Sequence, residues 1–178
     1  MKIYLDSSAY LKGFWKEYRS DVVLDVMELC ETGKLDIVIS TWTLAECISV
    51  IDKACNNKRI SSEEMDDTLK RLLAFSFNNE RKGRLILVRP DWTMIEKSFA
   101  YIRYYHLSAD DSLHAMCANI PPSDMMVLAD RGFSHFLKSP EEPKNEQELL
   151  ERPKIDFSVC NILNDSDLAD LRSTLERL

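Results

Sequence analysis

The chain has 178 residues and a formal net charge of -7, with 45 % hydrophobic residues, 30 % charged residues, four glycines and six prolines. This length fits one domain that can bury a core without disulfides or a structural metal, and the composition excludes a disordered or fibrous protein. The acidic balance argues against a protein that coats nucleic acid through a broad basic surface, but it is compatible with a small basic rim.

The N-terminal segment contains no long apolar run, because an acid stands at Asp6. We therefore expect neither a signal peptide nor a transmembrane span, no contact with a membrane, and a cytoplasmic location. The cysteines are odd in number, widely spaced and without a C-x-x-C pair, which predicts reduced residues packed in the core. They are Cys30, Cys47, Cys55, Cys117 and Cys160.

Apolar runs and turn signals predict alternating strands and helices in the first third of the chain. Residues 2–5 form a short apolar run that predicts a strand, and a helix follows from Asp6. Residues 22–30 have apolar side chains at helical spacing before a helix stop at Thr32-Gly33. The β-branched run 37–39 predicts a second strand, and residues 42–54 predict the helix that follows it.

The same alternation continues through the middle of the chain. A sequence typical of a capping box at 61–64 opens a helix that extends through Phe75, and residues 85–88 predict a third strand. Helices are then expected from Pro90-Asp91 to Tyr105 and from Ser108 to Ala118. Residues 125–129 predict a fourth strand, which ends at Asp130.

The character of the sequence changes beyond Lys138, where prolines interrupt an acidic stretch at Pro140, Pro143 and Pro153. We therefore expect a nuclease-like domain over residues 1–138 and a C-terminal extension over residues 139–178. Leucines at helical spacing near the end of the extension predict a terminal helix that docks on the domain or on a partner. These are Leu163, Leu168, Leu171 and Leu175.

Short apolar strands separated by helices predict parallel pairing, because a parallel connection needs a crossover. The expected class is α/β, with a central parallel sheet of about four to five strands flanked by helices on both faces. Such sheets bind ligands beyond the carboxyl ends of their strands. Asp6 and Asp130 each follow a predicted strand, and Glu46 lies less than two turns into the helix after the second strand. These acids should lie at the same edge.

Each candidate acid also has a structural explanation. Asp6 and Asp130 can cap the helices that follow them, and two further pairs fit S/T-x-x-E/D capping boxes, Thr43–Glu46 and Ser108–Asp111. Taken singly, each acid is better explained as a cap. Taken together they are not, because capping predicts no preference for one sheet edge whereas a metal site needs convergent oxygens. Carboxylates without His or Cys partners suit Mg²⁺ or Mn²⁺ rather than zinc.

Four sequence motifs resemble those of the PIN-domain family, which includes VapC-type toxins and PilT N-terminal-like nucleases. The motifs are Ile3-Tyr4-Leu5-Asp6-Ser7-Ser8-Ala9, Ser40 to Glu46, Asp111-Ser112-Leu113-His114-Ala115 and Leu128-Ala129-Asp130-Arg131-Gly132-Phe133. Their order and spacing agree with the family over about residues 1–138. The resemblance implies a PIN-like three-layer sandwich and an endoribonuclease that cleaves RNA phosphodiester bonds with Mg²⁺ or Mn²⁺.

The resemblance also assigns roles to individual residues. Asp6, Glu46, Asp111 and Asp130 become the catalytic, metal-binding acids, the first three at a tighter metal position and Asp130 completing the site or holding a second ion. Ser8 would orient a carboxylate or a metal-bound water. Arg131 and Lys12 are candidate phosphate contacts, although cations at such intervals are usually the solvated faces of helices. Leu128 departs from the family pattern, in which a Thr or Ser is common.

Two further residues near Asp111 are interpreted as structural. Asp110 should point about 100° away from Asp111 on a helix, so it is a helix-start charge favoured by the dipole. His114 follows Asp111 by one turn and could form a D-x-x-H ligand pair. A single His without a second His or Cys is more often packed or hydrogen-bonded, so we leave it outside the predicted site.

Partners follow from the resemblance: an RNA substrate, an antitoxin protein if the chain is the toxin of a toxin–antitoxin pair, and a second copy in a homodimer. Two alternatives stay open. One is a non-catalytic PIN-like module that binds RNA or protein, for which the extension gives a reason. The other is a haloacid-dehalogenase-like phosphoryl-transfer enzyme with Asp6 as nucleophile, but such enzymes require a second Asp where this chain has Ser8.

Overall fold

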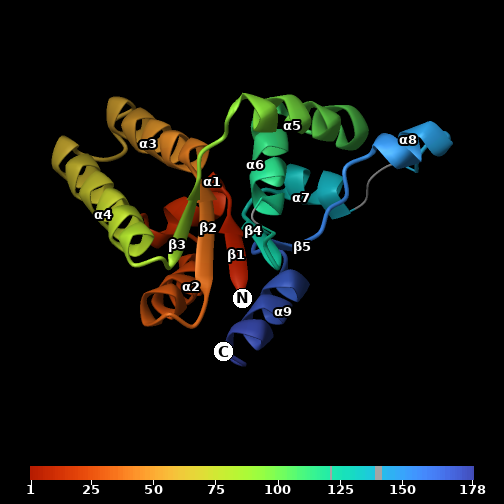
Figure 1. The fold of residues 1–178 in the computed structure, drawn as a ribbon. Helices are drawn as coiled ribbons and strands as arrows, with labels where there is room; N and C mark the ends of the chain where they lie inside the picture. Colours follow the sequence, from red (N-terminus) through yellow and green to blue (C-terminus); the bar gives the residue numbers. More distant parts are fainter. Residues whose placement is uncertain (121, 139–141) are drawn as a thin grey trace.

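Five parallel strands form one central sheet in the order β3-β2-β1-β4-β5 (Figure 1). The structure is a computed structural model that describes residues 1–120, 122–138 and 142–178. Its strands are β1 (Lys2–Leu5), β2 (Asp36–Ser40), β3 (Leu85–Val88), β4 (Met125–Leu128) and β5 (Ser158–Asn161). Consecutive strands are joined through helices, as parallel connections require.

Helices fill the connections and cover both faces of the sheet. On the N-terminal side they are α1 (Ser7–Tyr10), the 3₁₀ turn η1 (Leu11–Gly13), α2 (Ser20–Thr32), α3 (Thr41–Asn56) and α4 (Ser62–Arg81). They continue with α5 (Trp92–Tyr105), α6 (Ala109–Asn119), α7 (Arg131–Lys138), α8 (Glu146–Glu151) and α9 (Asp165–Leu175). The α/β class with a parallel sheet flanked by helices is confirmed.

Alternation along the strands divides the apolar side chains between two cores. Ile3 and Leu5 of β1 belong to a core with α1 to α4 and α9, whereas Tyr4 between them belongs to a second core with α5, α6 and α7. Both faces of the strands are therefore buried, which explains their almost continuous apolar sequences. The same alternation decides which layer each side chain at the strand ends can reach.

Part of the terminal segment belongs to the sheet. β5 pairs with β4 from Met125–Ser158 to Leu128–Asn161, and α9 packs against α2 and β5. The predicted terminal helix is thus present and docks on the domain. The division of the chain at residue 138 stays a prediction, but residues 158–175 lie within the fold. The predicted proline interruption at Pro140 falls outside the described residues.

The other predicted elements occur close to their expected positions, with one clear difference. The helix expected after Asp6 is a single α-helical turn followed by η1, which ends at Gly13. The cysteines are free, and four of the five are buried. No helix in the described residues is long and apolar enough to cross a membrane.

Candidate active site

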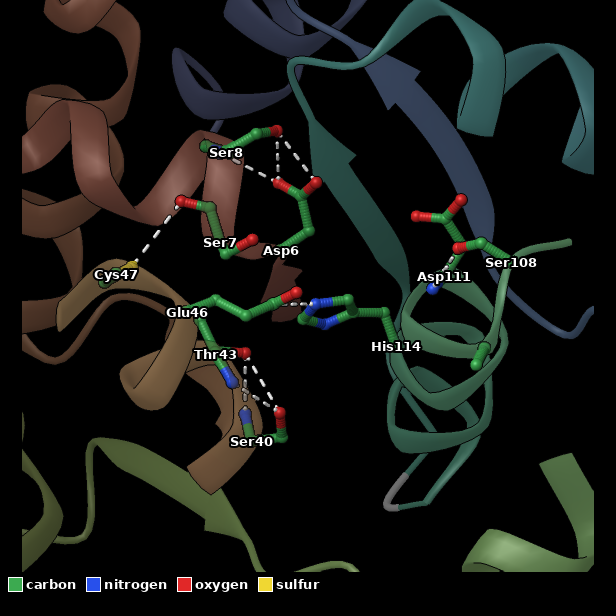
Figure 2. Close-up of polar contacts among 12 residues, drawn as sticks. Asp6, Ser7, Ser8, Ser40, Thr43, Glu46, Cys47, Ser108, Asp111 and His114 are labelled. Carbon is green, nitrogen blue, oxygen red and sulfur yellow. Dashed lines mark hydrogen bonds and ion pairs between the residues drawn. The ribbon is translucent and has the colours of Figure 1, made fainter. Parts of the chain in front are cut away.

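Asp6 lies at the carboxyl end of β1, where its side chain caps α1. Its Oδ1 accepts hydrogen bonds from the Ala9 backbone N–H at 2.8 Å and from Ser8 Oγ at 2.9 Å, and Ser8 Oγ lies 2.8 Å from the other carboxylate oxygen (Figure 2). Ser8 Oγ also accepts the backbone N–H of Ala129 at 2.8 Å. The serine hydroxyl therefore connects the ends of β1 and β4 beside the carboxylate.

Burial changes the acidity of Asp6. The residue is 4 % exposed, and this burial raises its pKa to about 6. The charge of His114 and the bonds from Ala9 and Ser8 act in the opposite direction, while the charge of Glu46 raises the pKa further. A carboxyl group held in this way is costly to ionise, as is common at functional sites.

Glu46 reaches the same edge from α3, and it is not a cap. Ser40 is the N-cap of α3 and forms a reciprocal capping box with Thr43, whose backbone N–H lies 3.0 Å from Ser40 Oγ. The predicted Thr43–Glu46 capping box is therefore wrong, because α3 begins at Thr41, three residues earlier than that box requires. Glu46 has no capping function, and its side chain is free to point toward α6.

His114 binds Glu46 and connects it to the sheet. Its Nε2 lies 2.6 Å from Glu46 Oε2, and its Nδ1 lies 2.8 Å from the hydroxyl of Tyr4. Burial raises the pKa of Glu46, but the hydrogen bond and charge of His114, together with hydrogen bonds from Ser7 and Trp42, lower it, and the net shift is downward. Because an ionised carboxylate only accepts hydrogen bonds, Nε2 of His114 donates to Glu46.

Asp111 and Asp130 form the other side of the site. Ser108 caps α6 by accepting the backbone N–H of Asp111 at 3.1 Å. Asp130 caps α7, since its Oδ1 accepts the backbone N–H of Phe133 at 2.9 Å. The predicted helix caps at Asp6 and Asp130 are therefore both confirmed. The pKa of Asp111 is raised by burial and, to a smaller extent, by the charge of Asp130.

The electrostatic interactions group these acids around His114. The charges of His114 and Glu46 act on the pKa of Asp6, and the charges of Asp130 and His114 act on the pKa of Asp111. All four acids occur at or just beyond the carboxyl edge of β1, β2 and β4. However, no three His, Cys, Asp or Glu side chains of the described residues lie close enough together to hold a metal ion. The structure brings the acids to one edge, but within the described residues it contains no preformed metal site.

Comparisons of the sequence alone find no relative: no family model matches it, and no curated protein is significantly similar. Comparison of the fold does. The toxin VapC20 of Mycobacterium tuberculosis, which cleaves the sarcin–ricin loop, aligns with a TM-score of 0.53 and 12 % identity over 74 % of this chain and 92 % of that chain. A chain of VapBC2 from Rickettsia felis, bound to promoter DNA, aligns with a TM-score of 0.50 and 17 % identity over 76 % of this chain and 93 % of that chain.

The chain has the PIN-domain fold of VapC-type proteins. This confirms the fold expected from the four sequence motifs, and it places the motif acids at the carboxyl edge of a PIN-type sheet. At these identities the likeness concerns the fold, so the roles of the individual acids stay predictions.

The two predicted phosphate contacts have different surroundings in the PIN-type fold. Lys12 is buried and its Nζ lies 2.8 Å from Glu17, in a cavity that contains none of the four acids. Arg131 is exposed, directly follows Asp130, and has no ion pair within the described residues. The position of Arg131 is compatible with a phosphate contact. The ion pair of Lys12 with Glu17 disfavours such a role for Lys12.

His114 is a residue of this candidate site that sequence reasoning left out. The prediction that it is packed and hydrogen-bonded is correct, because its side chain is 3 % exposed. Its bonds nevertheless end on a candidate catalytic acid. The sequence signal was its position one turn after Asp111, which gives both side chains one helix face. The partner, Glu46, is 68 positions away and could not be identified from spacing.

Proposed function

We propose that the chain is a metal-dependent endoribonuclease that hydrolyses RNA phosphodiester bonds at the site containing Asp6, Glu46, Asp111 and Asp130. The observation that carries this proposal is the arrival of four acids from different elements at one sheet edge, where burial raises the pKa of both Asp6 and Asp111. Raised carboxyl pKa values in one cluster suit a function that a cation would complete. The VapC-type fold supports the same class.

The chemistry of the site suits Mg²⁺ or Mn²⁺. All four side chains supply oxygen, which these hard cations prefer, and a cation would offset the repulsion within each pair of acids. Since no group of three is preformed within the described residues, loading requires side-chain movement. Asp6, Glu46 and Asp111 are the proposed main ligands, with Asp130 completing the site. A bound ion would polarise the phosphoryl oxygen and activate water.

Other residues of the chain would keep the carboxylates in place. Ser8 holds Asp6 through its hydroxyl while it binds the end of β4. His114 holds one oxygen of Glu46 through its Nε2. Carboxylates fixed in this way lose less freedom when they bind a ligand, so the site is partly preorganised.

The biological setting is part of the same proposal. VapC20 is a toxin that cleaves the sarcin–ricin loop, and VapBC2 is bound to a DNA fragment from its promoter. By analogy, this chain would be a toxin with an antitoxin partner, would act in the cytoplasm and would form a homodimer. One surface suits a second copy: α5 exposes apolar residues at helical spacing, namely Trp92, Ile95, Phe99 and Ile102.

The test is cleavage of a mixed single-stranded RNA pool by purified wild type, Asp6→Asn and Asp110→Asn, each with Mg²⁺, Mn²⁺ or EDTA. Asp110 is an exposed neighbour of Asp111 and serves as the matched control, since it is not one of the proposed ligands. We expect cutting by wild type and Asp110→Asn with metal, and none with EDTA or by Asp6→Asn. RNA binding without cutting under every condition would favour the non-catalytic module, which the absence of a preformed metal cage among the described residues also permits.

A further inference from the structure

We propose that a polar pocket beside Asp130 binds a backbone phosphate of the RNA substrate. The cavity has a volume of about 280 Å³ and lies between α7 and the segment that joins β5 to α9. Its polar lining includes Arg131, His135 and Lys138 from α7, and Asn161, Asn164 and Asp167 from the terminal segment. This inference rests on the proposed ribonuclease function and adds a site for the substrate.

The pocket continues the line of acids along the sheet edge. Strand order places β5 next to β4, and Asn161 at the end of β5 is paired with Leu128 at the end of β4. The side-chain amide of Asn161 also donates to the backbone oxygen of Asp130 at 3.1 Å. A strand of RNA that crosses the carboxyl edge past Asp6 and Asp130 would next meet this pocket.

The charge of the pocket suits an anion. Arg131, His135 and Lys138 are spaced four and three residues apart, so they share one face of α7. Lys138 is neutralised by an ion pair with Asp167, which leaves Arg131 as the cation with no ion pair within the described residues. Within the lining of the pocket, Arg131 is therefore the guanidinium that is available to an anion.

The size and chemistry of the pocket suit one phosphate group. A volume of about 280 Å³ is at the lower limit of cavities that hold a whole small molecule, but it is ample for a single anionic group. An Arg guanidinium can donate two parallel hydrogen bonds to phosphate oxygens. Because the neighbouring acids would act on a phosphodiester, the adjacent phosphate of the same strand is the anion that reaches Arg131.

The terminal segment gives the pocket a fixed wall. Asp167 accepts the backbone N–H of Asn161 at 2.8 Å, and the side-chain oxygen of Asn161 accepts the N–H of Leu163 at 3.0 Å. These bonds orient Asn161 between the pocket and Asp130. Residues beyond the motif region therefore have a role in this proposal: they complete the substrate surface.

The experiment measures binding without cleavage. A fluorescently labelled single-stranded RNA of mixed sequence is titrated in EDTA with wild type, Arg131→Gln, Arg131→Lys and Arg81→Gln, at several salt concentrations. Arg81 ends α4 just before β3, at the opposite edge of the sheet, and is the matched control. Unfolding temperatures establish that every variant is folded. Cleavage of the same RNA with Mn²⁺ by wild type is recorded in parallel.

We expect Arg131→Gln to weaken RNA binding several-fold and to reduce the slope of log K against log salt by about 0.7, the value for one lost contact to a single strand. Arg131→Lys should restore the slope, and Arg81→Gln should match wild type. If wild type cleaves and binds RNA but Arg131→Gln behaves like Arg81→Gln, the pocket proposal is wrong while the nuclease proposal stands.

The remaining outcomes are also decisive. If wild type neither binds nor cleaves RNA, both proposals fail together. An acidic peptide such as oligoglutamate, added as a competitor, tests the other source of negative charge. If that peptide binds in an Arg131-dependent manner and RNA does not, the pocket is a protein-docking site and the phosphate proposal is overturned.

Discussion

The imidazole of His114 lies between Glu46 and Tyr4, with Nε2 at 2.6 Å from Glu46 Oε2 and Nδ1 at 2.8 Å from the Tyr4 hydroxyl. Tyr4 is completely buried in β1, so this chain of hydrogen bonds runs from the central strand through α6 to a side chain of α3. A carboxylate at the open edge of the sheet is thus fixed by a buried group.

Replacement of His114 should weaken metal binding more than it disturbs the fold. In His114→Leu, Glu46 loses the hydrogen bond from His114, and loss of such an outer partner typically costs about 10-fold to 100-fold in metal affinity. His114→Gln can still donate a hydrogen bond and should retain part of the affinity. Mn²⁺ binding measured by electron paramagnetic resonance gives the affinity independently of RNA cleavage.

Met116→Leu is the control for the His114 variants. Met116 is also buried on α6, but the hydrogen bond to Glu46 comes from His114. It should bind Mn²⁺ as wild type does. Equal Mn²⁺ affinity in His114→Leu and wild type would show that the Glu46–His114 bond has no role in metal binding.

The raised pKa of Asp6 predicts a specific dependence of stability on pH. Its folded pKa of about 6 exceeds the usual value of 3.8, so between these values the folded chain holds more protons than the unfolded chain. The contribution of Asp6 to stability therefore falls as pH rises from about 4 to about 6 and is then constant. The loss is on the order of 3 kcal/mol.

Asp6→Asn removes this ionisation and keeps a residue type that caps helices. Urea unfolding in EDTA should give a stability difference between the variant and wild type that grows in favour of Asp6→Asn from pH 4 to pH 6 and stays level above pH 7. A difference that does not vary over this range would mean that Asp6 ionises normally. Added Mn²⁺ should stabilise wild type alone.

Sequence reasoning located the strand-borne part of the site because strand ends have strong local signals. Asp6 and Asp130 directly follow apolar runs, and a parallel sheet brings the carboxyl ends of its strands to one edge. Their capping function could be predicted as well. The two functions do not exclude each other, since the bonds that cap a helix also hold the carboxylate in position.

The parts that sequence reasoning missed depend on contacts between distant residues. β5 has only four residues, Ser-Val-Cys-Asn, and its mixed polarity gives no strand signal until β4 pairs with it. Ser40, and not Thr43, is the N-cap of α3, because the helix starts directly at the end of β2. The spacing of Thr43 and Glu46 alone did not identify this cap. The partnership of Glu46 with His114 required the fold itself.

Ser8 should contribute to stability as well as to the site. In Ser8→Ala the N–H of Ala129 loses its acceptor, and the loss of this partly buried hydrogen bond should cost about 1 kcal/mol. The pKa of Asp6 should also rise, because the Ser8 hydroxyl now lowers it. Urea unfolding measures the first effect, with Ser49→Ala on the exposed face of α3 as the control. Equal stability of the two variants would contradict a connecting role for Ser8.

The exposed stripe on α5 gives a test of the proposed homodimer. Trp92 is 74 % exposed and Phe99 is 54 % exposed, and with Ile95 and Ile102 they repeat at intervals of three and four residues, which suits packing against another helix. If two copies pair through α5, Phe99→Glu would bury a charge in the interface and should convert a dimer into a monomer. Phe77→Glu, at a similarly exposed position on α4, should remain dimeric. Light scattering coupled to size-exclusion chromatography gives the mass directly, and a monomeric wild type at micromolar concentration would contradict the homodimer.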